Sequence, residues 1–189
     1  MPTLDELRAQ AENCTACPLH LTRSRVVFGS GNTNAGGLLI IGEAPGKDED
    51  NSGFPFVGKA GQVLTRLLHH AGIDREACYI TNTVLCRPPE NREPTPQEQQ
   101  ACNHFLLEQI ETVNPGAIVT VGKTATSRLL GVFGPMSELM KQEHTFNGRI
   151  LVYPIWHPAY LLRLGTSDRA KQVAKECVEQ LKLADKIPF

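Results

Sequence analysis

The chain has 189 residues, a net charge of −1 and an ordinary globular composition, with 41% hydrophobic and 21% charged residues. This length suits a single domain, so we expect residues 1–189 to form one folded unit. The charge excludes a protein that attracts nucleic acid through its overall field, and any such contact must come from a local patch. No apolar run approaches the length of a membrane span, which predicts a cytoplasmic protein that does not contact membranes.

The hydrophobic pattern predicts helices and strands that alternate along the chain. A capping box formed by Thr3 and Glu6 starts a first helix, which ends near Cys14. The later predicted elements are a strand over 38–41, a helix over 62–71, a strand over 79–85, a helix that opens at Thr95, a strand over 117–121, a helix over 123–130, a strand over 150–156 and a helix over 168–184.

This alternation predicts an α/β fold, namely a single three-layer domain in which helices flank a central, mainly parallel four-stranded sheet. In such sheets the functional site lies beyond the carboxyl ends of the strands. The loops after Ile41, Leu85 and Trp156 all leave strand ends of this kind. We therefore expect these three loops to meet at one site.

Four of the six cysteines have a spacing typical of a metal site. Cys14 and Cys17 form a C-x-x-C pair, whereas Cys86 and Cys102 are separated by fifteen residues, which fits a zinc ribbon poorly. Thiolates at such spacing hold zinc or an iron–sulfur cluster, and four unrelated buried cysteines are the alternative. The other two cysteines lie in apolar or helical patterns and are expected to be small buried residues.

Two loops that contain glycine carry further candidates. In residues 42–50, glycines at a strand end would let a ligand approach the backbone. The acidic side chains of that loop could position water, bind a metal or simply be solvated. In residues 54–61, an aromatic side chain offers a stacking platform for a flat ring, unless it is tucked into the core.

Polar side chains also occur at two predicted strands. Asn82 lies within an apolar strand, where a buried amide needs hydrogen bonds, so it could read the edge of a base or tie down a neighbouring loop. His157 ends the last strand and precedes two leucines and an arginine. An enzyme that acts on a flipped base needs a donor to a developing anion and an apolar wedge for the vacated stack. A capping histidine followed by ordinary helical leucines is the plainer interpretation.

Taken in chain order, these motifs resemble family 4 of the uracil-DNA glycosylase superfamily. The similarity extends from Cys14 to about Arg163 and includes the C-x-x-C pair, the GEAPG loop, the PFVGKAG stretch, the TN…CRPP…NR segment and the HPAYLLR segment. Each motif is weak alone, but five in the order of the family are highly specific. The resemblance implies a uracil-DNA glycosylase-like fold and an enzyme that hydrolyses the N-glycosidic bond of uracil in single- and double-stranded DNA.

The resemblance also implies roles for individual residues. Cys14, Cys17, Cys86 and Cys102 would hold a [4Fe–4S] cluster. In the base pocket, Phe56 would stack on uracil, Asn82 would recognise its edge and His157 would donate a hydrogen bond to its O2 atom, with further substrate contacts from Gly42, Ala44 and Asn91. Leu162 or its neighbour Leu161, with Arg163, would form a wedge in the DNA. Glu43 and Glu49 are both candidates for placing the attacking water or sensing the C5 position, and the sequence does not choose between them.

Two departures from relatives bear on the mechanism. Ala44 stands where the best-known family of the superfamily has an aspartate that activates water. Some relatives trap DNA covalently through a histidine just after the TN strand, whereas here Arg87 and Pro88 follow the cysteine. We therefore expect the enzyme to turn over and not to trap DNA. It is also expected to be a monomer and to use no metal in the chemical step. The alternatives are a non-catalytic uracil-DNA binder and an iron–sulfur electron carrier.

Overall fold

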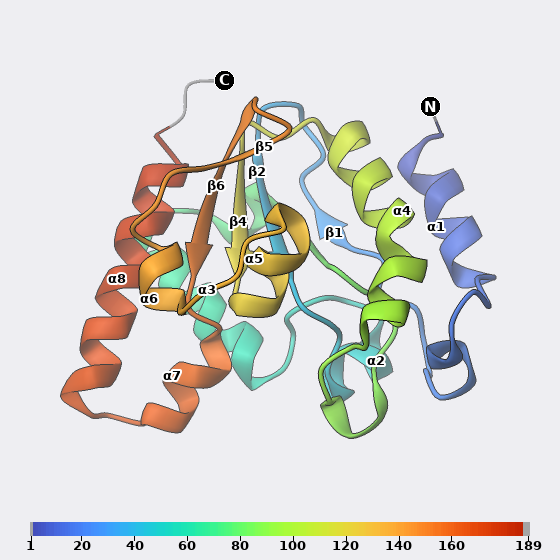
Figure 1. Cartoon of the computed structure of the whole chain (residues 1–189), viewed down its shortest axis with the longest axis horizontal. Coiled ribbons are helices and arrows are strands. Elements are labelled where there is room, and N and C mark those ends of the chain that lie inside the picture. The colour runs from blue at the N-terminus through green and yellow to red at the C-terminus, as the bar shows by residue number, and fades with distance from the viewer. Residues whose placement is uncertain (1, 187–189) are drawn as a thin grey trace.

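A six-stranded sheet forms the centre of the computed structural model, which describes residues 2–186. The strands pair in the order β1-β3-β2-β4-β6-β5. Figure 1 shows β2, β4 and β6 side by side at the centre of the molecule. Their bounds are β1 Ser30–Gly31, β2 Leu38–Gly42, β3 Cys78–Asn82, β4 Ala117–Val121, β5 His144–Phe146 and β6 Ile150–Ile155.

Helices make up most of the remaining regular structure. The α-helices are α1 Leu4–Glu12, α2 Lys47–Ser52, α3 Lys59–Ala71, α4 Pro96–Val113, α5 Lys123–Leu130, α6 Met136–Leu139, α7 Pro158–Leu164 and α8 Asp168–Ala184, and the short 3-10 helices are η1 Pro18–Leu21, η2 Arg75–Ala77 and η3 Pro89–Asn91. Within residues 2–186, none of the helices combines the length and the apolar character that crossing a membrane requires.

The four inner strands confirm the predicted parallel sheet. β2 pairs in parallel with both β3 and β4, and β4 pairs in parallel with β6. Two antiparallel edge strands extend this sheet, since β1 pairs with β3 and β5 pairs with β6. The sequence does not predict these edges because β1 has two residues and β5 has three, which is too short for a periodic hydrophobic pattern.

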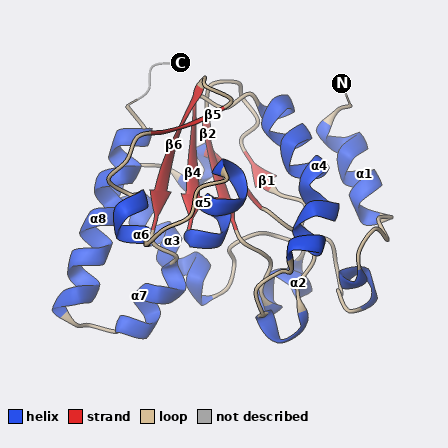
Figure 2. Cartoon of the chain, in the orientation of Figure 1, coloured by secondary structure: helices blue, strands red, loops and turns tan. Residues whose placement is uncertain are grey.

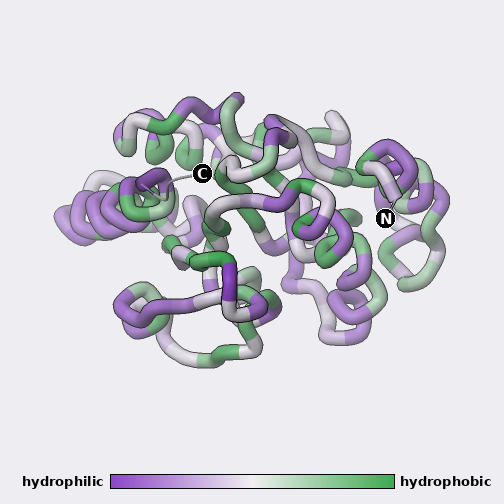
Figure 3. Tube along the Cα trace, turned by 90° about the horizontal axis from the view of Figure 1, so that it is seen from above, coloured by the Kyte–Doolittle hydropathy of each residue, from purple (hydrophilic) through white to green (hydrophobic). Residues whose placement is uncertain are grey.

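Side chains of the inner strands alternate between two hydrophobic layers. Leu38 and Ile40 of β2 belong to a core cluster with α3, α7 and α8, whereas Leu39 and Ile41 belong to a cluster with α4 and α5. Figure 2 shows the strands between these two sets of helices. In Figure 3, hydrophobic segments run through the middle of the molecule, and the outer helices mix hydrophobic and hydrophilic residues. The three-layer α/β architecture is therefore confirmed.

Local capping explains where several helices begin. α4 starts as predicted, because the Thr95 side chain accepts a hydrogen bond from the Glu98 N–H at 3.2 Å and proline occupies the first helical position. α2 and α7 are helices in segments predicted as loops. In α2, Glu49 accepts a hydrogen bond from the Gly46 N–H at 3.1 Å, and acidic residues in the first turn suit the positive end of the helix dipole.

Candidate functional site

A pocket of about 260 Å³ lies at the carboxyl ends of the parallel strands. The residues that line it come from the loops after β2, β3 and β6, and they are Glu43, Ala44, Pro45, Gly46, Glu49, Phe56, Ala60, Asn82, Pro88, Asn91, Arg92, His157 and Ala159. The expected convergence of three loops is therefore confirmed. Segments far apart in the sequence supply one small cavity.

Gly42 allows two of these side chains to approach the end of β2. A Cβ atom at this position would overlap Oδ1 of Asn82 and would lie 2.6 Å from the Phe56 ring. Any larger residue would therefore displace the amide, the ring or both. Gly42 shapes the pocket from below, although its own atoms do not line it.

Phe56 is held in an unusual backbone conformation. Its φ angle is 53°, in the left-handed region that costs free energy for a residue with a side chain. The guanidinium of Arg75 stabilises this turn by donating hydrogen bonds to the carbonyl groups of Pro55 and Phe56 at 3.0 and 3.1 Å. The Phe56 ring is 8% exposed, and its centroid lies 6.4 Å from that of His157.

Asn82 ends β3 and carries the buried amide of the pocket. The residue is 2% exposed. Within residues 2–186, no hydrogen bond to its side chain is formed, although neighbouring Thr81 donates to the Phe28 carbonyl at 2.9 Å. The amide atoms are not among the fully buried side-chain atoms that lack a partner, so they stay accessible from the pocket that Asn82 lines. The pocket therefore presents one acceptor and two donors to whatever fills it.

His157 occupies the N-cap position of α7. Its Nδ1 atom accepts a hydrogen bond from the Ala159 N–H at 3.1 Å. In a neutral imidazole with an accepting Nδ1, the proton is on Nε2, which is left to donate. Burial, with a smaller contribution from the Arg163 charge, lowers the pKa of His157 to about 4. The pocket therefore contains a neutral hydrogen-bond donor at pH 7.

Glu49 fixes the loop that carries the aromatic ring. Its Oε1 atom accepts hydrogen bonds from the Val57 and Gly58 N–H groups, both at 2.9 Å. Its Oε2 atom accepts from Gly46. Since both oxygens already have backbone partners, this carboxylate holds the two ends of the loop together.

Glu43 has a different environment in the same pocket. Burial raises the pKa of Glu43, and the charge of Glu93 adds to this effect, whereas the nearby Thr124 hydroxyl opposes it. In the structure, the single proton of that hydroxyl is donated to Glu93 at 3.0 Å. Of the two glutamates proposed from the sequence, Glu43 is thus the one that is not saturated by backbone donors.

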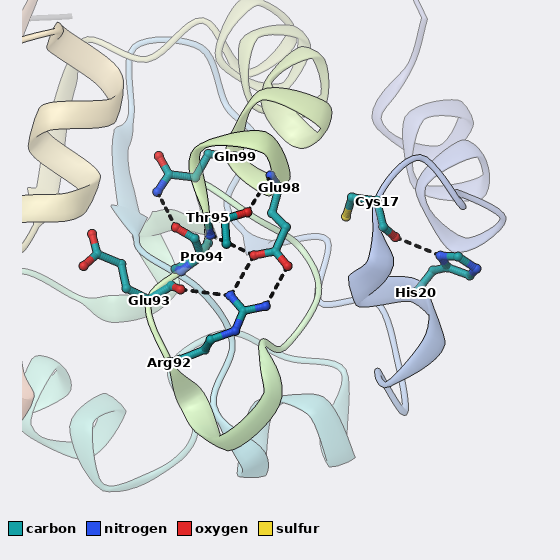
Figure 4. A network of polar contacts seen from close by, with 8 residues as sticks. All are labelled: Cys17, His20, Arg92, Glu93, Pro94, Thr95, Glu98 and Gln99. Atoms are coloured by element: carbon teal, nitrogen blue, oxygen red, sulfur yellow. Dashed lines mark hydrogen bonds and ion pairs between the residues drawn. The ribbon is translucent and has the colours of Figure 1, made fainter.

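The loop after β3 forms the rim of the pocket. Asn91 is exposed and accepts a hydrogen bond from Arg87 at 2.7 Å. Arg92 makes two hydrogen bonds to the buried carboxylate of Glu98, at 2.7 and 2.8 Å (Figure 4). These bonds, with a further one from the Thr95 backbone, lower the pKa of Glu98 to about 2. This ion pair was not predicted from the sequence, although Glu98 occupies the third position of α4, where a glutamate commonly completes a capping box.

The structure separates the two leucines that were considered for the wedge. Leu161 is 9% exposed and packs into the core cluster with α3 and α8. Leu162 is 44% exposed, and Arg163 is also exposed, with its guanidinium 5.7 Å from the Tyr160 ring centroid. Burial therefore favours Leu162 over Leu161, and the wedge itself stays a prediction.

The four predicted metal ligands line a second pocket. This pocket contains Cys14, Cys17, Cys86 and Cys102. Burial raises the pKa of Cys102 to about 12, and the charges of the other three thiols add to the effect, which reflects their proximity. Beside the pocket, Arg23 donates a hydrogen bond to the Cys86 sulfur at 3.2 Å.

The donor set of this second pocket fits an iron–sulfur cluster. Among the described residues, no group of three or more His, Cys, Asp and Glu side chains is arranged to hold a metal ion. Four cysteine thiolates are the usual protein ligands of an iron–sulfur cluster, so the chemistry of the donor set fits such a group. His20 hydrogen-bonds the Cys17 carbonyl at 2.8 Å and closes the turn after the C-x-x-C pair (Figure 4).

Comparison with known proteins agrees with this geometry. The family model of the uracil DNA glycosylase superfamily matches residues 28–182. A type-4 uracil-DNA glycosylase of Thermotoga maritima is 47% identical over 92% of this chain and 90% of its own length. A type-4 enzyme of Archaeoglobus fulgidus is 38% identical over 86% of this chain and 84% of its own length. A type-5 uracil-DNA glycosylase of Pyrobaculum aerophilum is 31% identical over 66% of this chain and 62% of its own length. The chain therefore belongs to the uracil DNA glycosylase superfamily and, within it, to the type-4 uracil-DNA glycosylases.

Proposed function

We propose that the protein flips uracil out of DNA, hydrolyses its N-glycosidic bond and leaves an abasic site for base excision repair. The observation that carries this proposal is the pocket in which Phe56, Asn82 and His157 lie together. An aromatic ring, an unpaired amide and a neutral imidazole can supply stacking, edge recognition and anion stabilisation. The type-4 relatives, whose names state this activity, support the same conclusion.

Asn82 would select uracil by its hydrogen-bonding pattern. Its amide oxygen can accept from uracil N3–H, and its NH₂ group can donate to O4. Cytosine presents an acceptor at N3 and a donor at its amino group, so its binding would leave buried groups unpaired. A site of this kind discriminates by a factor of the order of 10⁴. Phe56 would stack on the ring that Asn82 reads.

His157 would stabilise the departing base. Breaking the glycosidic bond leaves a sugar with oxocarbenium character and a uracil anion, with charge on O2. A hydrogen bond from Nε2 to this oxygen is stronger in the transition state than in the bound substrate, so it accelerates the reaction. One such donor in an enclosed site contributes about 2.7–4 kcal/mol. Because its pKa is about 4, the imidazole stays neutral and donates without transferring a proton.

Glu43 is the better candidate for placing the attacking water. Glu49 already accepts three backbone hydrogen bonds, so we assign it the positioning of the Phe56 loop. Glu43 lines the pocket without such a set of partners. The neighbouring Ala44 lacks a polar side chain that could take over this role.

Leu162 and Arg163 would contact DNA beside the flipped base. Leu162 is an exposed apolar side chain on α7, directly after the strand that delivers His157. Such a side chain can fill the gap left in the base stack. Arg163 and the substrate-facing loop residues Gly46 and Asn91 would support it at the rim, and nearby phosphates would be held by backbone amides and local basic residues.

Cys14, Cys17, Cys86 and Cys102 would hold a [4Fe–4S] cluster. Such a cluster would cross-link the N-terminal segment, the loop after β3 and α4, and the proposed bond cleavage would need no metal. Arg23, which donates to the Cys86 sulfur, would compensate part of the negative charge of the thiolates. We further expect the whole chain to act as one monomeric domain in the cytoplasm, on single- and double-stranded DNA.

A base-release assay tests the proposed function. Oligonucleotides with one uracil, single-stranded or paired with guanine or adenine, should release free uracil and gain an alkali-labile site. Matched oligonucleotides with thymine or cytosine at that position should remain intact. Tight binding to uracil-DNA without release would instead indicate a non-catalytic binder. Redox activity without any effect on DNA would indicate an electron carrier.

A further inference from the structure

Two adjacent carboxylates of α2 contact different parts of the chain. Glu49 accepts hydrogen bonds from Val57 and Gly58, in the segment 53–58 that we name the Phe56 loop. Asp50 accepts hydrogen bonds from the Ser24 and Arg25 N–H groups, at 2.9 and 3.3 Å. Asp50 is a charged residue that is only 2% exposed. One short helix thus holds two segments that are otherwise separate.

The segment held by Asp50 leads directly to the four-cysteine site. Arg23 precedes the two amides that Asp50 binds, and its guanidinium donates to the Cys86 sulfur at 3.2 Å and to the Glu12 carbonyl at 3.0 Å. A continuous series of contacts therefore runs from a thiol of that site, through residues 23–25 and α2, to the backbone next to Phe56.

We infer that Asp50 is a positioning residue that couples the occupancy of the four-cysteine site to the order of the Phe56 loop. This inference rests on the proposed cluster. With thiolates bound to iron, Arg23 has a fixed anionic partner, and the amides of Ser24 and Arg25 stay in place for Asp50. Without the iron-bound thiolates, residues 23–25 lose this contact, and the Ser24 and Arg25 amides that hold Asp50 of α2 are no longer fixed.

Physical reasons make the Phe56 loop sensitive to that anchor. α2 has six residues, which is too short for a helix to be stable without contacts outside itself. Phe56 has a positive φ angle of 53°, which persists only while its surroundings enforce it. If α2 shifts, Glu49 no longer accepts the hydrogen bonds from Val57 and Gly58, and the Phe56 ring is no longer held in one position. A purely local role for Asp50 would instead affect residues 24 and 25 alone.

Hydrogen exchange of backbone amides tests this coupling without relying on catalysis. The holoprotein would be compared with protein from which iron has been chelated anaerobically, with exchange read at Val57 and Gly58. The variants are Asp50→Ala, Asp50→Asn, which keeps an accepting oxygen, and Asn51→Ala, an exposed neighbour on the same helix that serves as the matched control. Iron content and the protection of β2 and β4 amides would be measured in parallel to establish loading and folding.

The expected results form a specific pattern. Removing iron from the wild type should speed exchange at Val57 and Gly58 by ~10-fold or more, since these amides report local opening. Asp50→Ala should show fast exchange there even with iron bound and the sheet protected, and iron removal should add nothing. Asp50→Asn and Asn51→Ala should behave as the wild type.

Two outcomes overturn the inference while leaving the proposed activity intact. One is an exchange rate at Val57 and Gly58 that iron removal does not change in the wild type. The other is iron-loaded Asp50→Ala whose loop is as protected as that of the wild type. A freshly purified protein without iron would contradict the cluster and the coupling together, whereas uracil release is measured separately.

Discussion

Nδ1 of His157 accepts a hydrogen bond from the backbone N–H of Ala159 at 3.1 Å. One side chain thus caps α7 and orients the group that lines the uracil pocket. The contact also assigns the two nitrogens, because an accepting Nδ1 places the proton on Nε2. The start of a helix therefore determines which nitrogen of His157 is free to donate, and in the proposed reaction this atom would face the departing base.

Replacing His157 by serine should separate these two roles. Serine is a good N-cap and can accept from the helix amide, but it has no donor at the position of Nε2. We expect His157→Ser to lower the single-turnover rate of uracil release by roughly 10²–10³-fold, with little change in affinity for uracil-DNA. Rapid-quench kinetics and binding to a DNA with a non-cleavable uracil analogue measure the two quantities. Weakened binding with an intact single-turnover rate would falsify the catalytic assignment and make His157 a DNA contact.

The lowered pKa of His157 predicts how stability depends on pH. The pKa of His157 is about 4 in the folded protein, whereas a histidine in the unfolded chain titrates near 6.5. Between these values the unfolded chain binds more protons, so the free energy of unfolding falls as pH is lowered from about 6.5 toward 4. His157→Ser should show a smaller loss over this interval in denaturant titrations at pH 7 and pH 5. An equal loss in both proteins would mean that His157 does not titrate as described. In the wild type, the catalytic imidazole should remain neutral down to about pH 5.

Asn82 variants test base selection. Asn82→Ala removes the acceptor and the two donors of the amide side chain, so the rate of uracil release should fall severely. Asn82→Asp should retain some activity and gain measurable release of cytosine, because a carboxyl group can accept from the cytosine amino group. Parallel assays on uracil- and cytosine-containing single strands give both rates. Near-normal release by Asn82→Ala would remove this residue from the recognition site.

Cysteine variants test the cluster. The purified protein should be brown, with broad absorbance near ~400 nm and about four irons per chain. Cys102→Ala should lose iron and lower the unfolding temperature. Cys78→Ala and Cys177→Ala are matched controls, because both thiols are buried away from the four-cysteine pocket, and they should keep their iron. Colourless protein with one zinc after anaerobic purification would contradict the prediction.

Leu161 and Leu162 should respond in opposite ways to truncation. Leu162→Ala should retain stability and activity on single strands but lose activity on duplex DNA, where a vacated stack must be filled. Leu161→Ala should lower the free energy of unfolding by about 2–5 kcal/mol, because it leaves a cavity in the core. Thermal melts and release rates on both substrates distinguish the pair. Loss of duplex activity by a fully stable Leu161→Ala would instead place that residue in the wedge.

Residues at strand ends were the part of the pocket that the sequence could predict. Gly42 and Asn82 end β2 and β3, and His157 follows the end of β6 by two residues. These strands have clear hydrophobic patterns, and parallel strands bring their carboxyl ends together. The four inner strands and the start of α4 could also be predicted, because hydrophobic patterns and capping residues are local features of the sequence.

Contacts between distant loops could not be predicted in this way. Glu49 binds amides eight and nine residues away, in a segment without periodicity. The partners of Asp50 are even more distant in sequence, because they precede it by 25 and 26 residues. The choice between Leu161 and Leu162 depends on how α7 is rotated against α3 and α8, and packing alone decides that rotation. The short strands β1 and β5 carry too few residues to show a pattern.

These two short strands also determine how the protein behaves in a crowded solution. An open sheet edge is a template on which another chain can add a strand, and a long flat edge promotes aggregation. Here the sheet ends on β1, with two residues, and on β5, with three, so each rim offers few free backbone groups. Gly31 further bends the β1 rim, with a φ angle of 119° that extended strands do not use. β1 and β5 cover two residues of β3 and three of β6, so only short stretches of these outer parallel strands have no neighbouring strand. Chains that refold at high concentration would therefore have little continuous edge on which to join one another.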